Sequence, residues 1–138
     1  MPKRILIVDD EPEFAELVRY RLADERYEFE YSPRGMDALN KFSLFQPDLA
    51  LLDILLPDLD GLTLCKALNR QPGTRQLPII LISALDTTAT RAAGREAGAC
   101  SFLAKPVDFA QLKTLLVTVF TEPSTPKLET GDLESICG

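Results

Sequence analysis

Short apolar runs alternate with longer amphipathic segments along this chain of 138 residues, and this alternation limits its fold more than any other feature. Apolar runs of four to eight residues predict strands, and segments with apolar residues on one helical face predict helices. Strands that alternate with helices are typical of a parallel sheet with helices packed on its faces. The pattern therefore predicts an α/β fold of five strand and helix pairs.

The predicted strands cover residues 5–8, 27–31, 49–52, 78–82 and 100–104, and each is followed by a predicted helix. Residues 27–31 alternate aromatic and acidic side chains, as in a half-exposed strand at the edge of a sheet. Pro12 suits the first turn of a helix. The apolar residues of that helix are expected to share one buried face: Phe14, Leu17, Val18 and Leu22.

The chain contains no histidine, which excludes several kinds of chemistry. It cannot build a Ser-His-Asp triad, an imidazole general base, a histidine zinc ligand or its own phosphohistidine. Its 21 acidic and 15 basic side chains give a net charge of -6. That balance lacks the basic stripe with which proteins neutralise nucleic acid phosphates, so we expect no direct binding to nucleic acid.

The length fits one domain, which we place at residues 1–120. Residues 121–138 contain four acidic side chains against one lysine, together with two prolines, and are predicted to be a flexible acidic tail or linker. The first apolar run ends at Asp9 and is too short for a signal peptide, and no stretch approaches the ~20 apolar residues of a membrane helix. We expect a cytoplasmic location and no membrane partner.

Polar side chains follow four of the predicted strands at their carboxyl ends. Asp9 and Asp10 follow the first strand, Asp53 the third, Ser83 the fourth and Lys105 the fifth. Because parallel strands all end at the same rim of a sheet, these side chains are expected to converge.

Each of these residues also has a purely structural interpretation. Asp9 or Asp10 could cap the following helix, and Asp53 could form an Asx turn at the end of its strand. Ser83 and Lys105 could simply be loop and surface residues. The combination favours a site, because three neighbouring carboxylates repel one another and need a cation. Two carboxylates, a backbone carbonyl and waters suit Mg2+, and the metal beside a lysine and a hydroxyl suits phosphoryl transfer to Asp53.

Four blocks of sequence resemble the receiver domain of bacterial response regulators, the phospho-acceptor half of two-component signalling. They are ILIVDDE at 5–11, LLDILLPDLDG at 51–61, ILISA at 80–84 and FLAKP at 102–106. The resemblance spans residues 3 to about 120. It implies a flavodoxin-like receiver fold, in which a five-stranded parallel sheet of order 2-1-3-4-5 carries helices on both faces.

The resemblance also implies roles for individual residues. Asp53 corresponds to the aspartate that accepts the phosphoryl group. Asp10, Asp9, Asp53 and the backbone carbonyl of Leu55 correspond to the positions that hold Mg2+. No other cofactor is expected.

Three further positions correspond to the family's switch. Ser83 and Lys105 match the hydroxyl and the ammonium group that bind phosphoryl oxygens, and Phe102 matches an aromatic residue that turns inward when the hydroxyl moves. By the same analogy, the bond between Lys105 and Pro106 is expected to be cis.

The family implies a partner that donates the phosphoryl group, either a sensor histidine kinase or a histidine phosphotransfer protein. Phosphorylation would change the face formed by the fourth helix, fifth strand and fifth helix, and favour a homodimer or an effector. We expect a signalling switch domain and not an enzyme. Its only expected activities are self-phosphorylation from phosphodonors and slow autodephosphorylation. The alternative is a pseudo-receiver, a protein-interaction module that works without phosphorylation.

Two residues beside the site depart from the polar groups found in many relatives. Leu55 lies two residues after Asp53, and Leu85 lies two residues after Ser83. We expect these apolar side chains to shield an acyl phosphate from water and to slow its hydrolysis.

Overall fold

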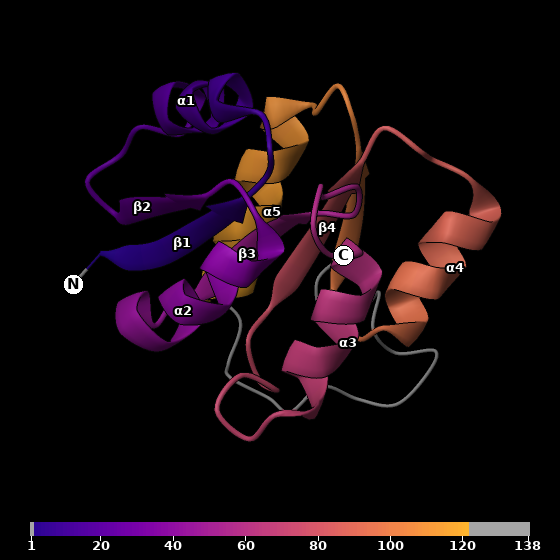
Figure 1. Cartoon of the computed structure of the whole chain (residues 1–138). Coiled ribbons are helices and arrows are strands. Elements are labelled where there is room, and N and C mark those ends of the chain that lie inside the picture. The colour runs from indigo at the N-terminus through magenta and orange to yellow at the C-terminus, as the bar shows by residue number, and fades with distance from the viewer. Residues whose placement is uncertain (1, 122–138) are drawn as a thin grey trace.

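A computed structural model describes residues 2–121 of the chain, in which strands and helices alternate (Figure 1). The strands are β1 (Lys3–Val8), β2 (Tyr27–Ser32), β3 (Leu49–Asp53), β4 (Ile79–Ser83) and β5 (Ser101–Ala104). The helices are α1 (Pro12–Arg21), α2 (Gly35–Phe45), α3 (Gly61–Arg70), α4 (Thr88–Glu96) and α5 (Phe109–Thr121). Each predicted strand is present, with ends at most two residues from the prediction, and a helix follows each strand.

The strands form one parallel sheet in the order β2-β1-β3-β4-β5, which confirms the predicted fold class and strand order. β2 lies at an edge, as its alternating pattern predicts. β2 pairs with one edge of β1, and the chain then crosses back to place β3 on the other edge of β1. The order in which strands are added across the sheet therefore reverses between β1 and β3. A crevice forms at such a switch point, at the carboxyl ends of the two strands.

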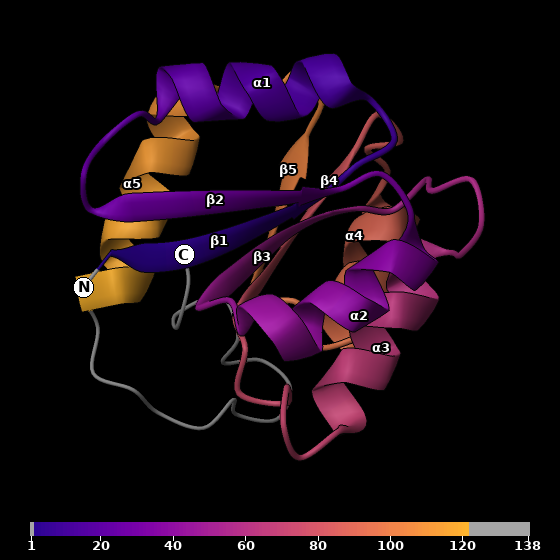
Figure 2. The same ribbon diagram turned by 60° about the vertical axis from the view of Figure 1, so that its left-hand side comes forward.

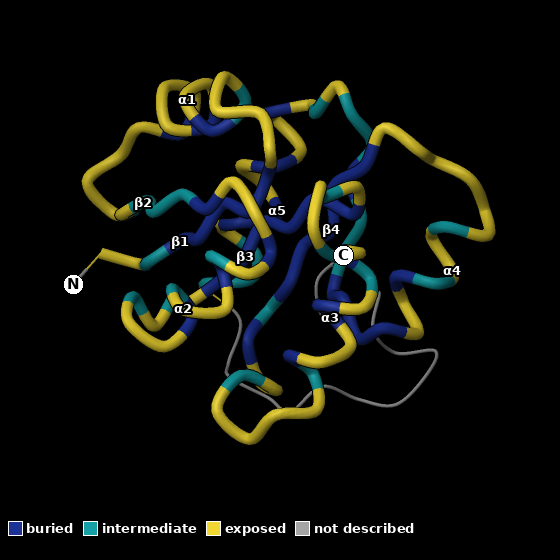
Figure 3. The backbone as a smooth tube through the Cα atoms, viewed as in Figure 1, coloured by how far each residue is buried: buried dark blue, intermediate teal, exposed yellow. Residues whose placement is uncertain are grey.

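Two helical layers cover the sheet, one on each face (Figure 2). α1 and α5 pack on one face, where their buried residues join alternate residues of the central strands. α2, α3 and the end of α4 pack on the other face. The central strands are buried on both sides, which explains why they read as continuous apolar runs (Figure 3). In the part of the chain that the structure describes, no helix combines the length and apolar character of a membrane span.

The buried face of α1 differs from the prediction at one position. Ala15, Val18 and Leu22 are buried and Phe14 is partly buried, whereas Leu17 is 43% exposed. Ala15 belongs to the same core cluster as Val18 and Leu22, so the buried face is rotated away from Leu17. The assignment of Leu17 to the core was therefore wrong.

The predicted domain boundary at residue 120 falls at the end of α5, which continues for one more residue to Thr121. The remaining residues of the predicted acidic tail, 122–138, lie outside the described part of the chain.

The loop after β3 is held tightly against its neighbours. The Gly61 amide donates to the carbonyl oxygen of Ile54 at 2.9 Å, and a Cβ atom at Gly61 would lie 2.3 Å from the carbonyl oxygen of Asp53. Only glycine allows α3 to begin so close to the end of β3. Asp58 ties the same loop to α2, because its carboxylate accepts the amides of Gly35 (2.9 Å) and Met36 (3.0 Å).

Candidate functional site

The predicted site residues meet at the carboxyl ends of the strands. Asp53 is the last residue of β3 and Ser83 the last residue of β4. Asp9 directly follows β1, and Lys105 directly follows β5. Residues up to 96 positions apart in the chain thus come into contact, as the parallel topology requires.

Three of these residues bring carboxylate oxygens to within 4.8 Å of one another: Asp9, Asp10 and Asp53. Asp9 and Asp53 are only 1% and 4% exposed, and Asp10 is exposed to solvent. Hard oxygen donors in this number, with one side open to water, fit Mg2+, which retains several waters when a protein binds it.

Lys105 lies against two of the three carboxylates. Its Nζ atom is 2.7 Å from Oδ2 of Asp9 and 3.4 Å from Oδ2 of Asp53. It also contacts Oε1 of Glu11 at 2.9 Å, a residue that the sequence analysis did not assign to the site. Glu11 continues the acidic run after Asp10, so its position in the sequence was a usable signal. The centroid of the Phe14 ring lies 4.8 Å from Nζ of Lys105, within the range of a cation–π contact.

The two buried aspartates are held in the same way. In each, Oδ1 accepts a backbone amide two residues later, from Glu11 to Asp9 at 2.8 Å and from Leu55 to Asp53 at 3.1 Å. In each, Oδ2 faces Lys105. The backbone bonds fix one oxygen of each carboxylate and leave the other oxygen oriented toward Lys105.

The structure tests the capping and turn interpretations of the three aspartates. The N-cap position of α1 is Glu11, whose side chain makes no capping hydrogen bond, so neither Asp9 nor Asp10 occupies the cap. The Asx-type bond of Asp53 is present, but it engages only Oδ1. The turn and the site therefore use different oxygens of the same carboxylate.

The electrostatics of the site follow from burial. Burial raises the pKa of Asp53 to about 6, assisted by the negative charge of Asp9 and opposed by the Leu55 amide and by Lys105. Burial also raises the pKa of Asp9, although its hydrogen bond with Lys105 opposes the shift. For Lys105, burial lowers the pKa, but the bonds to Asp9 and Glu11 and the charge of Asp53 outweigh it and raise the pKa. The lysine is thus a permanent cation at this site.

Ser83 and Phe102 lie on the neighbouring strands β4 and β5. Ser83 is fully buried, and its Oγ atom accepts the amide of Leu85 at 3.0 Å. The ring of Phe102 is partly buried and packs against the core on the face that carries α4. The bond between Lys105 and Pro106 is cis, as the resemblance implies.

Leu55 and Leu85 are the apolar residues next to Asp53 and Ser83 in the structure. Their amides donate to Asp53 and Ser83, which places both backbones next to the polar groups of the site. Their side chains are 55% and 50% exposed. The structure thus places two large apolar side chains at the solvent side of the site.

Comparison with known proteins identifies a family and several relatives. The profile of the response regulator receiver domain matches residues 5–117. Response regulator PleD of Caulobacter vibrioides is 40% identical over 119 residues, which cover 83% of this chain and 26% of PleD. Response regulator MprA of a Mycobacterium species is 39% identical over 112 residues, which cover 81% of this chain and 48% of MprA.

A solved structure agrees with these relatives. The BeF3-activated N-terminal receiver domain of RstA from Klebsiella pneumoniae superposes with a TM-score of 0.80 at 33% identity, covering 87% of this chain and all of that one. The chain spans about a quarter to a half of the length of the curated relatives PleD and MprA.

Proposed function

This chain belongs to the family of response regulator receiver domains, and within that family we propose that Asp53 accepts a phosphoryl group from a partner's phosphohistidine in a Mg2+-dependent reaction. The observation that carries the proposal is the arrangement around Asp53. Its carboxylate is nearly buried at the end of β3, and the carboxylates of Asp9 and Asp10 lie within 4.8 Å. The ammonium group of Lys105 lies 3.4 Å from its Oδ2 atom.

The transfer converts a carboxylate into an acyl phosphate. An oxygen of Asp53 forms a bond to phosphorus while the bond from phosphorus to the donor imidazole nitrogen breaks, and that nitrogen keeps the electron pair. Asp53 is a competent acceptor, because a carboxyl group with a pKa of about 6 is roughly nine-tenths ionised at pH 7. Since this chain has no histidine, the donor lies outside it and is a kinase, a phosphotransfer protein or a small acyl phosphate.

The other groups of the site stabilise the charge of the transferred group. Asp9, Asp10, Asp53 and the backbone of Leu55 are the groups that would hold Mg2+, which neutralises negative charge on phosphoryl oxygens when bound. Lys105 can move from the carboxylates to a phosphoryl oxygen. The carboxylate of Glu11 is exposed, so water can replace Lys105 as its partner when the lysine moves.

The expected consequence of phosphorylation is a population shift of the face formed by α4, β5 and α5, which would favour a homodimer or an effector partner. The Ser83 hydroxyl leaves the Leu85 amide and binds the phosphate, and Phe102 turns toward the vacated space. We expect no turnover beyond self-phosphorylation and slow autodephosphorylation, and we expect the reaction to take place in the cytoplasm.

Intact mass measurement tests the proposal. The chain is incubated with acetyl phosphate, with Mg2+ or with a chelator, and the Asp53→Asn variant is treated in parallel. We expect one phosphoryl adduct in the wild type with Mg2+, and none with the chelator or in the variant. If the wild type remains unmodified under conditions that label another receiver domain, the phosphorylation-independent pseudo-receiver is the correct function.

A further inference from the structure

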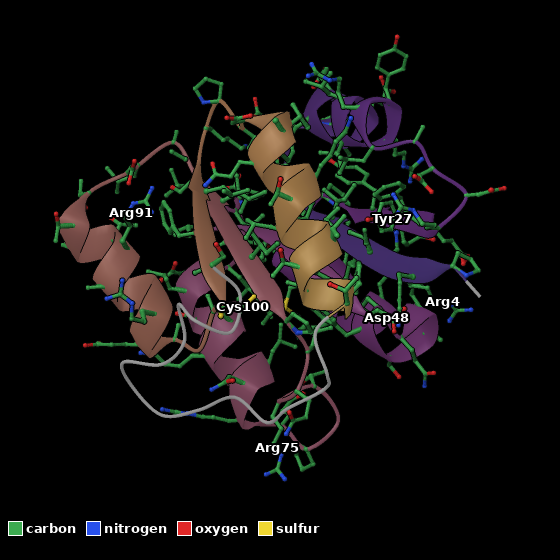
Figure 4. All side chains as sticks on the ribbon, turned by 180° about the vertical axis from the view of Figure 1, so that it is seen from behind. Arg4, Tyr27, Asp48, Arg75, Arg91 and Cys100 are labelled. Atoms are coloured by element: carbon green, nitrogen blue, oxygen red, sulfur yellow. The ribbon has the colours of Figure 1, made fainter. Side chains whose placement is uncertain are left out.

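Arg91 lies near the start of α4 (Figure 4), and its side chain binds the loop that leads into the helix. Its Nε atom donates to Oδ1 of Asp86 at 2.6 Å, and its Nη2 atom donates to Oδ2 at 3.3 Å. This two-point pair fixes the plane of the guanidinium group, which a single contact would not do. The hydrogen bond with Arg91 also lowers the pKa of Asp86, so the pair is charged at neutral pH.

The oriented guanidinium group covers the ring of Phe102. Its central carbon lies 4.7 Å from the ring centroid, within the range of a cation–π contact. The ring also lies next to the backbone of α4 at Gly94. A Cβ atom there would be 3.7 Å from Cδ2 of Phe102, an ordinary van der Waals distance, so the ring packs directly beside the helix backbone. The ring of Phe102, which projects from β5, is therefore in contact with the backbone of α4 and with the side chain of Arg91.

We propose that Arg91, oriented by Asp86, is a positioning residue that holds Phe102 against α4 in the unphosphorylated domain. The inference rests on the proposed function, because it concerns the same aromatic residue. When the ring turns toward Ser83 it must leave the guanidinium group, so the contact stabilises the resting form and not the activated one. Arg91 thus sets how much phosphorylation, or how much of a phosphate mimic, the domain needs in order to switch.

The loop also connects this contact to the phosphorylation site. Ser83 accepts the amide of Leu85, and Asp86 is the next residue along the chain. When the Ser83 hydroxyl moves to the phosphoryl group, it gives up the Leu85 amide and the loop is released. Asp86 can then no longer hold Arg91 in the same plane. Movement of Ser83 therefore has two effects. It weakens the contact of Arg91 with Phe102, and it opens the space that the ring enters.

Beryllofluoride, a mimic of the aspartyl phosphate, allows the proposal to be tested by NMR. Wild type and the variants Arg91→Ala, Asp86→Asn and Arg91→Lys are titrated with beryllium and fluoride in the presence of Mg2+. The fraction converted is read from the backbone amide signals of β5. A cation–π contact at an exposed site corresponds to about a two- to fivefold change in an equilibrium, so Arg91→Ala should convert at about two- to fivefold lower beryllofluoride. Asp86→Asn should shift in the same direction, and Arg91→Lys should lie between.

A second readout reports the ring directly and does not depend on phosphate chemistry. In the free wild type, we expect nuclear Overhauser contacts between the Phe102 ring and the α protons of Gly94. These contacts should weaken in Arg91→Ala. Arg70→Ala, which removes one exposed arginine from α3, serves as the matched control and should match the wild type in both measurements.

The outcomes separate this inference from the proposed function. If the wild type is not converted by beryllofluoride, the proposed function fails, and the ring contacts in the free proteins still decide the role of Arg91. If the wild type is converted and Arg91→Ala has the same or a higher midpoint with unchanged ring contacts, the positioning role is wrong and the proposed function stands. A thermal unfolding curve for each variant identifies any shift that comes from loss of folded protein.

Discussion

The Nζ atom of Lys105 lies 2.7 Å from Oδ2 of Asp9, although 96 positions separate the two residues in the chain. Their strands are not neighbours, because β3 and β4 lie between β1 and β5. The lysine therefore reaches across the rim of the sheet and contacts the carboxylates at the carboxyl ends of both β1 and β3. In the absence of a metal ion, it is the cation that offsets the repulsion among these carboxylates.

Replacement of Lys105 by methionine should destabilise the domain. The substitution keeps most of the side chain but leaves the nearly buried Asp9 without its cationic partner, at an expected cost of about 2 kcal/mol at neutral pH. Urea unfolding in a chelating buffer measures this change. Added Mg2+ should reduce the difference between variant and wild type, because the ion can take over the role of the ammonium group.

Glu11→Gln is the control for this experiment. It also removes an ion pair with Lys105, but the side chain of Glu11 is 61% exposed, so the expected change is within about 0.5 kcal/mol. Equal stabilities of Lys105→Met and wild type in the chelating buffer would contradict the role given to Lys105.

The raised pKa of Asp53 predicts a dependence of stability on pH. The carboxyl group binds a proton more tightly in the folded domain, with a pKa of about 6 against an ordinary value of 3.8. Its contribution is therefore fully favourable below about pH 4 and is lost as the pH rises to about 6. Without Mg2+, Asp53→Asn should gain up to roughly 3 kcal/mol relative to wild type between pH 4 and 7. A difference that stays constant over this range in denaturant unfolding would show that the pKa of Asp53 is not raised.

A methyl group at position 61 should damage both fold and site. A Cβ atom there would lie 2.3 Å from the carbonyl oxygen of Asp53 and 2.6 Å from Cα of Ile54, and the backbone cannot yield as a flexible side chain would. Gly61→Ala should lose about 1–3 kcal/mol of stability and react more slowly with acetyl phosphate. Gly73→Ala, where nothing lies within 4 Å of the added atom, should behave as wild type. Equal behaviour of both variants would contradict the close approach at Gly61.

Leu55 should protect the acyl phosphate. Its exposed apolar side chain stands next to Asp53, where a polar side chain could orient an attacking water. Leu55→Asn should shorten the lifetime of the phosphorylated domain by about threefold or more, which corresponds to at least ~0.6 kcal/mol in the barrier. The lifetime is followed by intact mass after the phosphodonor is removed. Leu44→Asn, on the exposed face of α2, is the control, and a lifetime in Leu55→Asn that is unchanged or longer would rule out shielding.

Much of this structure could be predicted from the sequence, because two strong regularities govern it. Parallel strands buried on both faces must be short and apolar, so the runs that end at Val8, Leu52 and Ile82 mark them clearly. Parallel topology then brings the residues after these strands to one rim, so Asp9 and Asp53 could be placed together before any contact was known.

What could not be predicted depends on distances between side chains. Helical spacing predicts that both Leu17 and Val18 are buried. Only the packing of Ala15 against the sheet shows which of them is buried. The contact of Arg91 with Phe102 joins residues on different elements, and no periodic pattern in the sequence encodes it.

The most direct test of the account is the identity of the phosphorylated residue. The chain is treated with acetyl phosphate and Mg2+, the acyl phosphate is reduced with borohydride, and the product is digested and sequenced by mass spectrometry. Reduction converts a phosphorylated aspartate to homoserine. We predict homoserine at position 53 and at no other aspartate, with Asp9 and Asp10 unchanged. Homoserine at a different position, or none in a sample whose intact mass shows a phosphoryl adduct, would contradict the assignment of Asp53 as the acceptor.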